Sequence, residues 1–325
     1  MSLNRRQLIA TSAASAALAT VGLPAYAQSF PNKPVRLIVP YPPGGSSDII
    51  ARAISQLLSE SLGQPVVVEN RAGANGNIGA DLVAKSAPDG HTMLLCDVGA
   101  LAISPSVYTK LAFNPSKDLR GVTMLAYSPH MLAVHPSVKA NNLKELVELS
   151  KTSDLNFAVT AVGSAPHVAG VAVQRATGAK WIYVPYKGGS QAVTDTVAGQ
   201  TQVIMNGMLA TLPHVQSGRL KVLGISKKTR MPLVGNVPTL AEQGVTGFES
   251  GTWQGVLVAN GTPPAIIARL NSELIKIIRS PDVRARLTGQ GAEVVTMQPA
   301  EQDALFERER KRWGEVVAEA NIKLD

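Results

Sequence analysis

Cysteine and aromatic residues are scarce in this sequence of 325 residues. Cys96 is the single cysteine, which excludes an intramolecular disulfide, and its place in the apolar run 93–96 favours a buried small residue over a nucleophile. Aromatic residues make up 4% of the chain and do not interleave with the basic residues, so stacking on single-stranded nucleic acid is not expected. The fold must therefore rest on an ordinary apolar core.

Catalytic and metal-binding motifs are also missing. The sequence contains no Gly-x-Ser-x-Gly, no phosphate loop ending in Gly-Lys-Ser/Thr, no His-Glu-x-x-His and no paired Cys-x-x-Cys. The histidines at 91, 130, 135 and 214 lack the spacing of metal ligands, so we expect neither a metal nor a cofactor. The formal net charge is +8, but the basic residues are scattered, which argues against nucleic-acid binding and suits anionic solutes.

The first 27 residues have the pattern of a secretory signal peptide. Arg5 and Arg6 precede an apolar run over 8–23, and small residues lead to a predicted cleavage site after Ala27. The adjacent arginines are compatible with twin-arginine export but do not distinguish it from the general route. No later segment is apolar enough to cross a bilayer. We therefore expect an exported, periplasmic protein without stable membrane insertion.

Short β-branched runs alternate with helical patterns from residue 35 onward. This alternation is typical of βαβ units and predicts an α/β fold in which the sheets are mostly parallel and flanked by helices. The expected strands lie at 35–39, 66–69, 92–96, 157–160, 182–185, 202–205 and 221–225.

Two longer extended passages interrupt the alternation, at 122–135 and 252–258. We interpret both as hinge crossings between two lobes. Residues 28–127 and 251–325 then form the first lobe, and residues 128–250 form the second. Three helices are expected near the C-terminal end, at 263–279, 281–290 and 300–321. They have N-terminal prolines and amphipathic spacing, and we predict that they pack against the first lobe.

The stretch 35–52 is the most informative part of the sequence. An apolar strand breaks into Pro-Tyr-Pro-Pro-Gly-Gly-Ser-Ser-Asp and restarts at once as a helix, with Ser46, Ser47 and Asp48 as favoured N-cap residues. The first N–H groups of a helix have no partner inside it, so a carboxylate or phosphate can dock there. The alternative is that the loop only turns the chain between strand and helix.

Three more loops precede predicted helices in the same way. One contains Gly163, Ser164 and His167, with Ser164 as the expected N-cap. The others span 71–77, which includes Asn75 and Gly76, and 186–190, which includes Lys187, Gly188 and Gly189. In open parallel sheets such loops gather at the carboxyl ends of the strands. Two lobes facing each other would therefore clamp one small anionic solute and remove it from water.

Four side chains in or near these loops can be interpreted in two ways. His167 either donates to an anion or faces solvent at the helix start, and Lys187 either adds charge to the site or is simply solvated. Asp97 would repel a carboxylate and attract an ammonium group, unless it points away or caps the next helix. Trp253 is more typical of a packing residue than of a ligand-stacking one.

Seven segments together resemble the substrate-binding receptors of tripartite tricarboxylate transporters, the Bug-type periplasmic receptors. They are Pro-Asn-Lys-Pro-Val-Arg at 31–36, Pro-Tyr-Pro-Pro-Gly-Gly-Ser-Ser-Asp at 40–48, Val-Glu-Asn-Arg-Ala-Gly-Ala-Asn-Gly-Asn-Ile-Gly at 68–79, Pro-Asp-Gly-His-Thr at 88–92, Gly-Ser-x-x-His at 163–167, Val-Pro-Tyr-Lys-Gly-Gly at 184–189 and Val-Pro-Thr-Leu-x-Glu-Gln-Gly at 237–244. The resemblance covers nearly the whole chain after the leader.

The resemblance implies the two-lobed periplasmic binding fold of the second type, which works as a monomer and delivers a carboxylated solute to membrane permease subunits. It implies that the loops at 41–46 and 163–167 hold this solute, with further contacts from the loops at 75–76 and 187–189 and from residue 206. With Asp97 from the loop argument, the candidate ligand-binding residues are Tyr41, Pro43, Gly44, Gly45, Ser46, Asn75, Gly76, Asp97, Gly163, Ser164, His167, Lys187, Gly188, Gly189 and Asn206.

Three positions depart from the family pattern and bear on the ligand. Ala165 replaces a common glycine, Asn206 replaces a frequent aspartate, and Cys96-Asp97-Val98 replaces a stretch more often rich in small hydroxyl residues. Asp97 would suit an amino acid if it faces the site, whereas an uncharged Asn206 would admit a neutral or aromatic end of an acid.

Two functions compete at this point. The first is a receptor without catalysis that binds a small organic acid. The second is an exported enzyme that acts on a carboxylated or phosphorylated small molecule through Ser164 and His167, although no orienting acid or oxyanion pattern accompanies this pair. Presentation of the bound acid to a membrane sensor would use the same clamp as transport.

Overall fold

The computed structural model describes residues 30–320 and residue 322, so the predicted signal peptide at 1–27 lies outside the described residues. The strands are β1 (Val35–Val39), β2 (Val66–Asn70), β3 (Thr92–Asp97), β4 (Leu119–Val134), β5 (Asn156–Val159), β6 (Ile182–Pro185), β7 (Val203–Gly207), β8 (Lys221–Ile225), β9 (Gly251–Ala259) and β10 (Glu293–Val294). The helices are α2 (Ser46–Leu62), η1 (Ala74–Gly76), α3 (Asn77–Ala84), α4 (Val98–Val107), α5 (Pro115–Asp118), α6 (Leu143–Ser150), α7 (Ala165–Thr177), α8 (Gly189–Val197), α9 (Met208–Gln216), η2 (Pro232–Val234), α10 (Pro264–Ile278), α11 (Pro281–Gly289) and α12 (Pro299–Ala320).

The strands form one long sheet in the order β2-β1-β3-β9-β4-β7-β5-β6, and β8 and β10 also pair with β4. Parallel pairs lie toward both ends, where β1 pairs with β2 and β3, and β5 pairs with β6 and β7. The predicted α/β class is confirmed, but the sheet is mixed instead of mostly parallel. The reason is that β4 and β9, the two crossing strands, run antiparallel to each other and to their other neighbours.

The crossing strands lie where the sequence predicted hinge passages. The first part of β4 pairs with β9 and β10, and its second part pairs with β7 and β8. The change of partners follows Ser128 and Pro129, since His130 already lies opposite Gly207. The assignment of 28–127 with 251–325 to one lobe and of 128–250 to the other stays a prediction.

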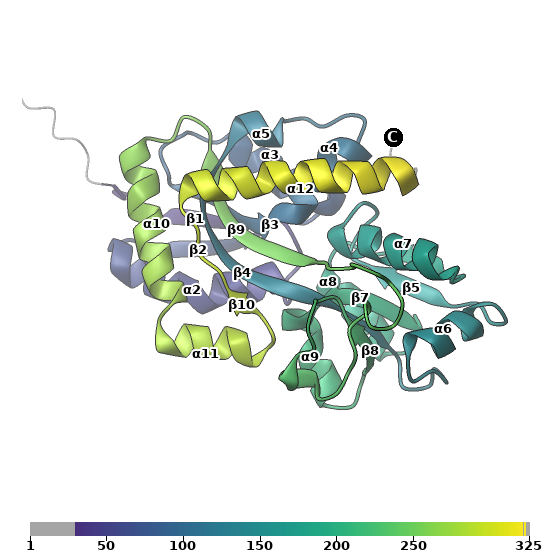
Figure 1. The fold of residues 1–325 in the computed structure, drawn as a ribbon. Helices are drawn as coiled ribbons and strands as arrows, with labels where there is room; N and C mark the ends of the chain where they lie inside the picture. Colours follow the sequence, from purple (N-terminus) through teal and green to yellow (C-terminus); the bar gives the residue numbers. More distant parts are fainter. Residues whose placement is uncertain (1–29, 321, 323–325) are drawn as a thin grey trace, which may run out of the picture.

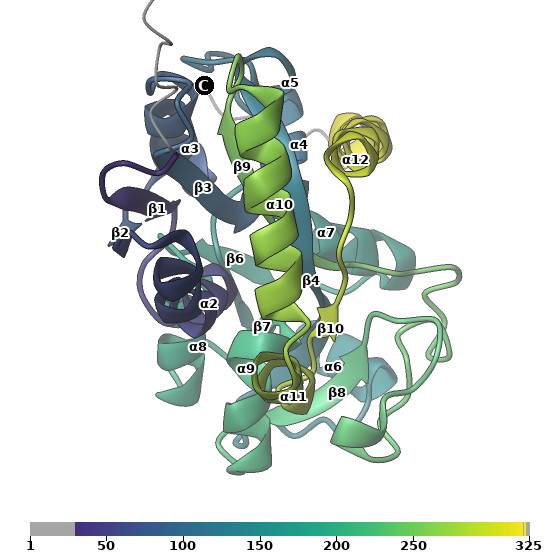
Figure 2. The same cartoon turned by 90° about the vertical axis from the view of Figure 1, so that its left-hand side faces the viewer.

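Helices cover both faces of the sheet (Figures 1 and 2). On the half formed by β1, β2 and β3, one apolar core lies under α2, α10 and α11, and another lies under α3, α4 and α12. On the other half, α6 and α7 cover one face, and α8 and α9 cover the opposite face. Each helix therefore buries its apolar stripe against the sheet, as the repeat of apolar residues in the sequence requires.

The last helix reaches further than the sequence suggested. In Figure 1, α12 runs across the top of β9 and β4 and ends beside α7. Trp313 and Val317 of α12 share a small core with Val107 of α4 and Val168 of α7. The C-terminal helix thus contacts both predicted lobes, because Trp313 and Val317 near its end are apolar and pack against α4 and α7.

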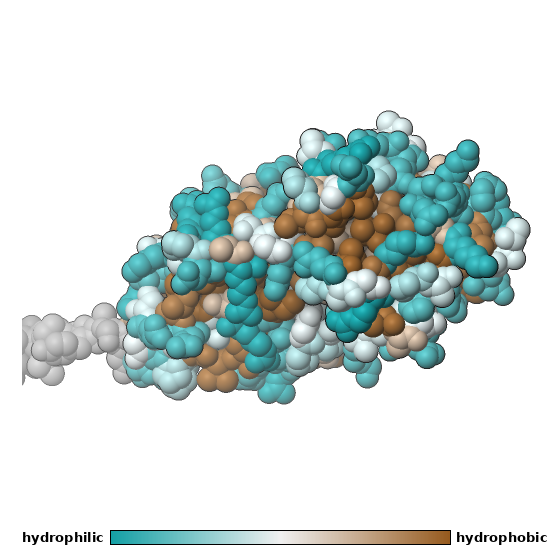
Figure 3. Space-filling model, turned by 90° about the horizontal axis from the view of Figure 1, so that it is seen from below, coloured by the Kyte–Doolittle hydropathy of each residue, from teal (hydrophilic) through white to brown (hydrophobic). Residues whose placement is uncertain are grey.

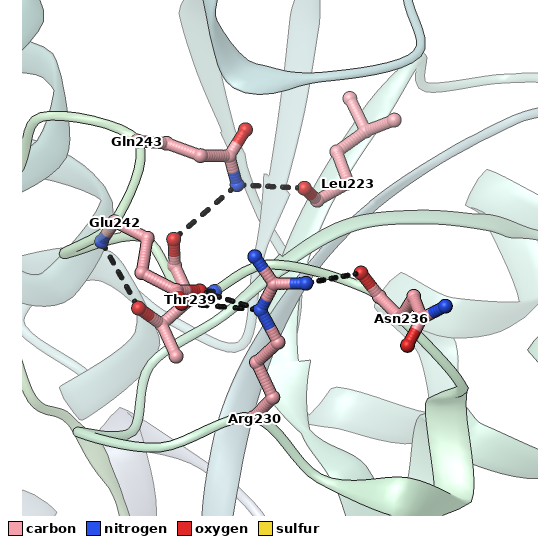
Figure 4. A network of polar contacts seen from close by, with 6 residues as sticks. All are labelled: Leu223, Arg230, Asn236, Thr239, Glu242 and Gln243. Atoms are coloured by element: carbon pink, nitrogen blue, oxygen red, sulfur yellow. Dashed lines mark hydrogen bonds and ion pairs between the residues drawn. The ribbon is translucent and has the colours of Figure 1, made fainter.

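The connection between β8 and β9 is held by polar contacts (Figure 4). Arg230 donates through Nε to both carboxylate oxygens of Glu242, at 3.1 and 3.0 Å, and the same carboxylate accepts from the Thr239 amide at 2.7 Å. Gln243 Nε2 donates to the carbonyl of Leu223 at 2.9 Å. These bonds tie an irregular segment back onto strand β8.

Figure 3 shows the lower face, where hydrophobic residues gather near the middle and hydrophilic residues surround them. Within the part of the chain that the structure describes, no helix is long and apolar enough to cross a membrane.

Candidate functional site

A cavity lies between the two halves of the sheet, at the first turns of several helices. Its volume is about 440 Å³, part of which is open to solvent. Many of its wall residues follow the carboxyl ends of β1, β3, β5 and β7, where ligands bind in open α/β sheets. The wall is formed by Tyr41, Gly45, Ser46, Ser47, Asn75, Asp97, Ala100, Thr160, Ser164, Pro166, Gly189, Asn206, Thr252 and Gln254.

The structure brings part of the predicted site together in this wall. The predicted residues found there are Tyr41, Gly45, Ser46, Asn75, Asp97, Ser164, Gly189 and Asn206. The others lie outside it: Pro43, Gly44 and Lys187 are exposed, and Gly76, Gly163, His167 and Gly188 are buried behind it. Ser46, Ser164 and Gly189 lie at helix starts and face the cavity. Tyr41 and Asn75 also line it, although they precede α2 and α3 in their loops.

Several wall residues were not predicted from the sequence. Thr252 and Gln254 lie on β9, which reaches the cavity only because β9 pairs with β3 and β4. Ser47 donates to Gln254 Oε1 at 2.6 Å and thereby ties the start of α2 to this strand. The wall also contains Ala100, Thr160 and Pro166. No motif in the sequence marks these three residues as part of a site.

The start of α2 presents free amides to the cavity. Its N-cap is Gly45, in extended conformation and without a side-chain cap, and not one of the serines or Asp48 as the sequence suggested. Ser46 and Ser47 are then the first helical residues, whose N–H groups have no partner within the helix. A helix start whose amides and hydroxyls line a cavity binds anions.

Asp48 fixes the conformation of the loop before α2 through hydrogen bonds. Its carboxylate accepts from the Gly44 amide, from Arg52 Nε and from Asn70 Nδ2, each at 2.9 Å. Burial alone raises the pKa of Asp48, but these bonds and the nearby guanidinium outweigh it and hold the pKa below its usual value. Asn70 also donates to the carbonyl of Tyr41 at 3.0 Å, so the loop is clamped at both ends.

We expect Asp48→Asn to destabilise the fold by about 1 to 3 kcal/mol at pH 7, because a buried network loses a charged acceptor. A depressed native pKa stabilises the fold above the unfolded-state pKa, and this contribution is lost as the pH falls through the native value. The gap between wild type and variant therefore closes toward pH 3, as measured by urea unfolding at both pH values. Asp154→Asn at an exposed site is the control; an equal gap at low pH would contradict the argument.

The start of α7 is capped as predicted. Ser164 Oγ accepts from the His167 amide at 3.3 Å and donates to the carbonyl of Ala161 at 2.8 Å. His167 Nδ1 accepts from the Gly163 amide at 3.0 Å, and the ring packs edge-on against Tyr183 with centroids 4.8 Å apart. Burial lowers the pKa of His167 to about 4, so the imidazole is neutral. Both side chains are engaged with the backbone, and the arrangement is not a serine–histidine catalytic pair.

Asp97 has two roles that the sequence treated as alternatives. It caps α4, with Oδ1 accepting from the amides of Gly99 and Trp253, both at 3.0 Å, and it also lines the cavity. Burial raises its pKa to about 7 although the backbone amides, including that of Ala100, oppose the shift. The side chain is 5% exposed.

Two asparagines of the wall have unpaired atoms. Asn206 is 5% exposed, and its Nδ2 has no hydrogen-bond partner among the described residues. Asn75 donates through Nδ2 to the carbonyl of Gly163 at 3.1 Å, a bond between the two predicted lobes, while its Oδ1 has no partner in the described part of the chain. An amide donor and an amide acceptor are thus available to a bound molecule.

The wall is free of cationic side chains. Among its described residues the ionisable groups are Tyr41 and Asp97, and the rest are hydroxyls, amides, glycines and small apolar residues. A bound anion would therefore be neutralised by backbone amides and neutral donors. Across residues 30–320 and 322, His, Cys, Asp and Glu side chains form no group of three or more that could hold a metal ion.

Comparisons with known proteins agree with this geometry. The family model of the tripartite tricarboxylate transporter family receptor matches residues 50–322. Protein BugT of Bordetella pertussis is 37% identical over 325 residues, which cover 99% of this chain and 100% of BugT. Rpa4515 of R. palustris, solved with adipate, is 32% identical with a TM-score of 0.87 and covers 91% of this chain and 100% of its own. MatC of Rhodopseudomonas palustris, solved with bound malate, is 32% identical with a TM-score of 0.83 and covers 89% of this chain and 100% of its own.

The family and its solved neighbours are substrate-binding receptors and not enzymes. Together with the engaged side chains of Ser164 and His167, this removes the enzyme alternative. The predicted resemblance and the two-lobed binding-protein fold class are confirmed. The chain therefore belongs to the receptor family of tripartite tricarboxylate transporters and is a Bug-type periplasmic solute-binding protein.

Proposed function

We propose that this receptor clamps a small carboxylated organic acid between its two lobes and delivers it to a tripartite tricarboxylate-type permease. The observation that carries the proposal is the uncapped start of α2, whose Gly45, Ser46 and Ser47 line a cavity without a cationic side chain among its described residues. A carboxylate fits such a site because it can accept several backbone amides at once.

The size of the cavity supports a small ligand. Its volume of about 440 Å³ lies in the lower part of the range that small-molecule sites have. Adipate and malate, which are bound in two solved relatives, are both short acids with a carboxylate at each end. The second carboxylate, or a neutral end of the acid, would face Asn206, whose free Nδ2 is a hydrogen-bond donor.

Closure of the two lobes is part of the proposal. Residues 28–127 with 251–325 would move against residues 128–250 around β4 and β9. Contacts across the cavity are close enough to stabilise the closed form: Asn75 bonds to Gly163, and Gly188 lies against Pro42. Closure would bring the anion out of water and strengthen each hydrogen bond to it.

Export and delivery complete the proposed cycle. A signal peptide cleaved after Ala27 would place the receptor in the periplasm as a monomer, and the closed form would be the one that membrane permease subunits recognise. The family membership supports this place in transport.

Thermal-shift measurements on the chain from Gln28 onward test the ligand class. The panel holds mono-, di- and tricarboxylates including adipate and malate, amino acids, aromatic acids and phosphate esters. A ligand at 100 times its dissociation constant stabilises the fold by about 2.7 kcal/mol, which raises the melting temperature visibly. A rise confined to carboxylates that are recovered unchanged supports the receptor; no rise with any acid, or consumption of one, contradicts it.

The role of the α2 amides is tested by Ser46→Pro. Proline is favoured at the first helical position, and Gly45 already has the extended conformation that a following proline requires, so we expect the fold to be unaffected. The variant lacks the Ser46 N–H, and affinity for the carboxylate falls about tenfold or more, since a hydrogen bond to a charged group contributes about 1.5 to 3 kcal/mol. Ser46→Ala, which keeps the amide, is the matched control, and equal affinity of Ser46→Pro and Ser46→Ala would contradict the assignment.

A further inference from the structure

Asp97 is a buried acid inside a cavity that we assign to anions. A carboxylate in that place would face the negative charge of the ligand, and the wall holds no lysine, arginine or histidine among its described residues to offset the repulsion. At a distance of a few ångströms in a low-dielectric cavity, two unpaired negative charges repel strongly. Either Asp97 is neutral in the complex or the anion does not bind tightly.

We propose that Asp97 enters the closed complex as a neutral carboxylic acid, so that the receptor takes up one proton with each anionic ligand. The inference rests on the proposed function and deepens it, because it makes Asp97 the group that couples affinity to pH. Oδ1 of Asp97 accepts from the amides of Gly99 and Trp253, so Oδ2 is the oxygen that carries the proton. Water or buffer supplies that proton, and an O–H bond forms on Oδ2 as the ligand is enclosed.

The surroundings of Asp97 favour this neutral form. Next to it, Tyr41 is half-buried and Cys96 is buried, and loss of solvation raises the pKa of both, so neither offers a charge. Glu309 on α12 is the nearby acid; it accepts from Trp313 Nε1 at 2.6 Å and opposes ionisation of Asp97 further. Strand β9 and helix α4, which pack against Asp97, carry no charged residue within Gly251–Ala259 and Val98–Val107.

The other ionisable groups near this region do not compensate. His167 on α7 is kept neutral by burial. Five pairs engage charged residues on the remaining neighbouring elements: Arg36 with Glu69, Asp48 with Arg52, Asp81 with Lys85, Glu307 with Arg310 and Glu309 with Arg312. Lys187, Arg308 and Lys311 are exposed and lie outside the wall. Among the described residues, no cation therefore lines the cavity to hold Asp97 ionised beside an anion.

The coupling has a definite sign. In the described conformation burial raises the pKa of Asp97 to about 7. Its bonding partners Gly99 and Trp253 lie in the same predicted lobe, so we expect a raised pKa in the open receptor as well, and a bound anion raises it further. Well below pH 7 the group is protonated in both forms, so binding takes up no proton. Above pH 7 the free receptor has lost the proton and must regain it, so affinity falls by up to about tenfold per pH unit.

The experiment is titration calorimetry of the chain from Gln28 with adipate and with malate between pH 6 and 8.5, in buffers of different ionisation enthalpy. We expect proton uptake near zero at pH 6 and approaching one per ligand at pH 8.5, with affinity falling in parallel. Asp97→Asn keeps a carbonyl oxygen for the two amides and mimics the neutral acid, so it binds at pH 8.5 as tightly as wild type does at pH 6, without proton uptake. Glu309→Gln is the control for the other nearby acid and retains the uptake.

The outcomes separate the two proposals. Constant affinity of the wild type with no proton exchange, or proton release on binding, overturns the role of Asp97 while the receptor function stands. Binding of aspartate or another amino acid that Asp97→Asn abolishes also overturns it, because Asp97 then pairs with an ammonium group. If no acid of the thermal-shift panel, adipate and malate included, binds at any pH, the proposed ligand class fails and this inference fails with it. The wild-type calorimetry alone decides the matter if Asp97→Asn does not fold.

Discussion

Gly188→Ala is expected to weaken ligand binding by about ten- to a hundredfold and to leave the stability of the ligand-free receptor almost unchanged. A Cβ atom at Gly188 would lie 2.3 Å from Pro42 Cδ and 2.9 Å from Pro42 Cγ, which no packed structure tolerates. The backbone of Gly188 is extended, so alanine introduces no conformational strain of its own. The effect comes only from the approach of the two loops.

We expect a large effect on ligand affinity and a small one on the stability of the ligand-free receptor because Pro42 and Gly188 belong to different predicted lobes. In an open receptor the loops are apart and the added methyl group meets nothing. Closure then carries an overpacking cost of about 1 to 3 kcal/mol, which appears as lost affinity. Calorimetry with the best acid of the panel measures this loss.

Gly289→Ala on α11 is the matched control, since a Cβ there meets no atom within 4 Å, and we expect its affinity to equal that of wild type. If Gly188→Ala instead lowers the melting temperature of the ligand-free protein by several degrees, the two loops are packed together without ligand. That result would contradict the proposed opening of the lobes in the ligand-free receptor.

Phe157→Ala is expected to produce the largest loss of stability, about 3 to 5 kcal/mol. The side chain is fully buried at the centre of the core under α6 and α7. Its ring lies 5.0 Å from that of Trp181 and 5.3 Å from that of Tyr183, and Gly170 of α7 packs directly on its edge. Truncation leaves a cavity that the rigid rings around it cannot fill.

A loss of this size lowers the melting temperature by about 10 °C. Urea unfolding of Phe157→Ala and of the conservative Phe157→Leu measures it, with a loss below about 1.5 kcal/mol expected for leucine because it nearly conserves volume. The ligand affinity of the folded variant is expected to change little. Phe157 does not line the cavity, and its ring contacts Tyr183, which in turn contacts His167. A loss below 1 kcal/mol for alanine would show that the core collapses around the gap.

Local chemistry explains why many boundaries could be predicted from the sequence. The strands at 35–39, 182–185 and 221–225 agree with β1, β6 and β8 residue for residue, and the helix predicted at 281–290 agrees with α11 to within one residue. Ser164 caps α7 as its position before Ala-Pro predicts. Such features depend on neighbours in the chain, because caps, prolines and apolar periodicity act over one or two turns.

The cavity wall was predictable from the sequence where it coincides with a helix start. Gly45, Ser46, Ser164 and Gly189 carry that signal, and the structure places them in one wall. The same signal placed Pro43 and Lys187 in the site, although both are exposed, because a loop motif does not tell which of its residues face inward.

By itself the sequence determined the α/β class, the order of strands and helices and the loops that hold the helix starts, because these follow from periodicity, caps and breakers within short windows. Only the tertiary structure decided that β4 and β9 run antiparallel, that Gln254 reaches the cavity and that Asp97 both caps α4 and lines the cavity. Ser47 and Gln254 are 207 positions apart in the chain and meet at 2.6 Å. Contacts of this kind arise when whole helices and strands pack together. A short window of sequence does not indicate which distant elements will pack, because the free energy of packing depends on the whole fold.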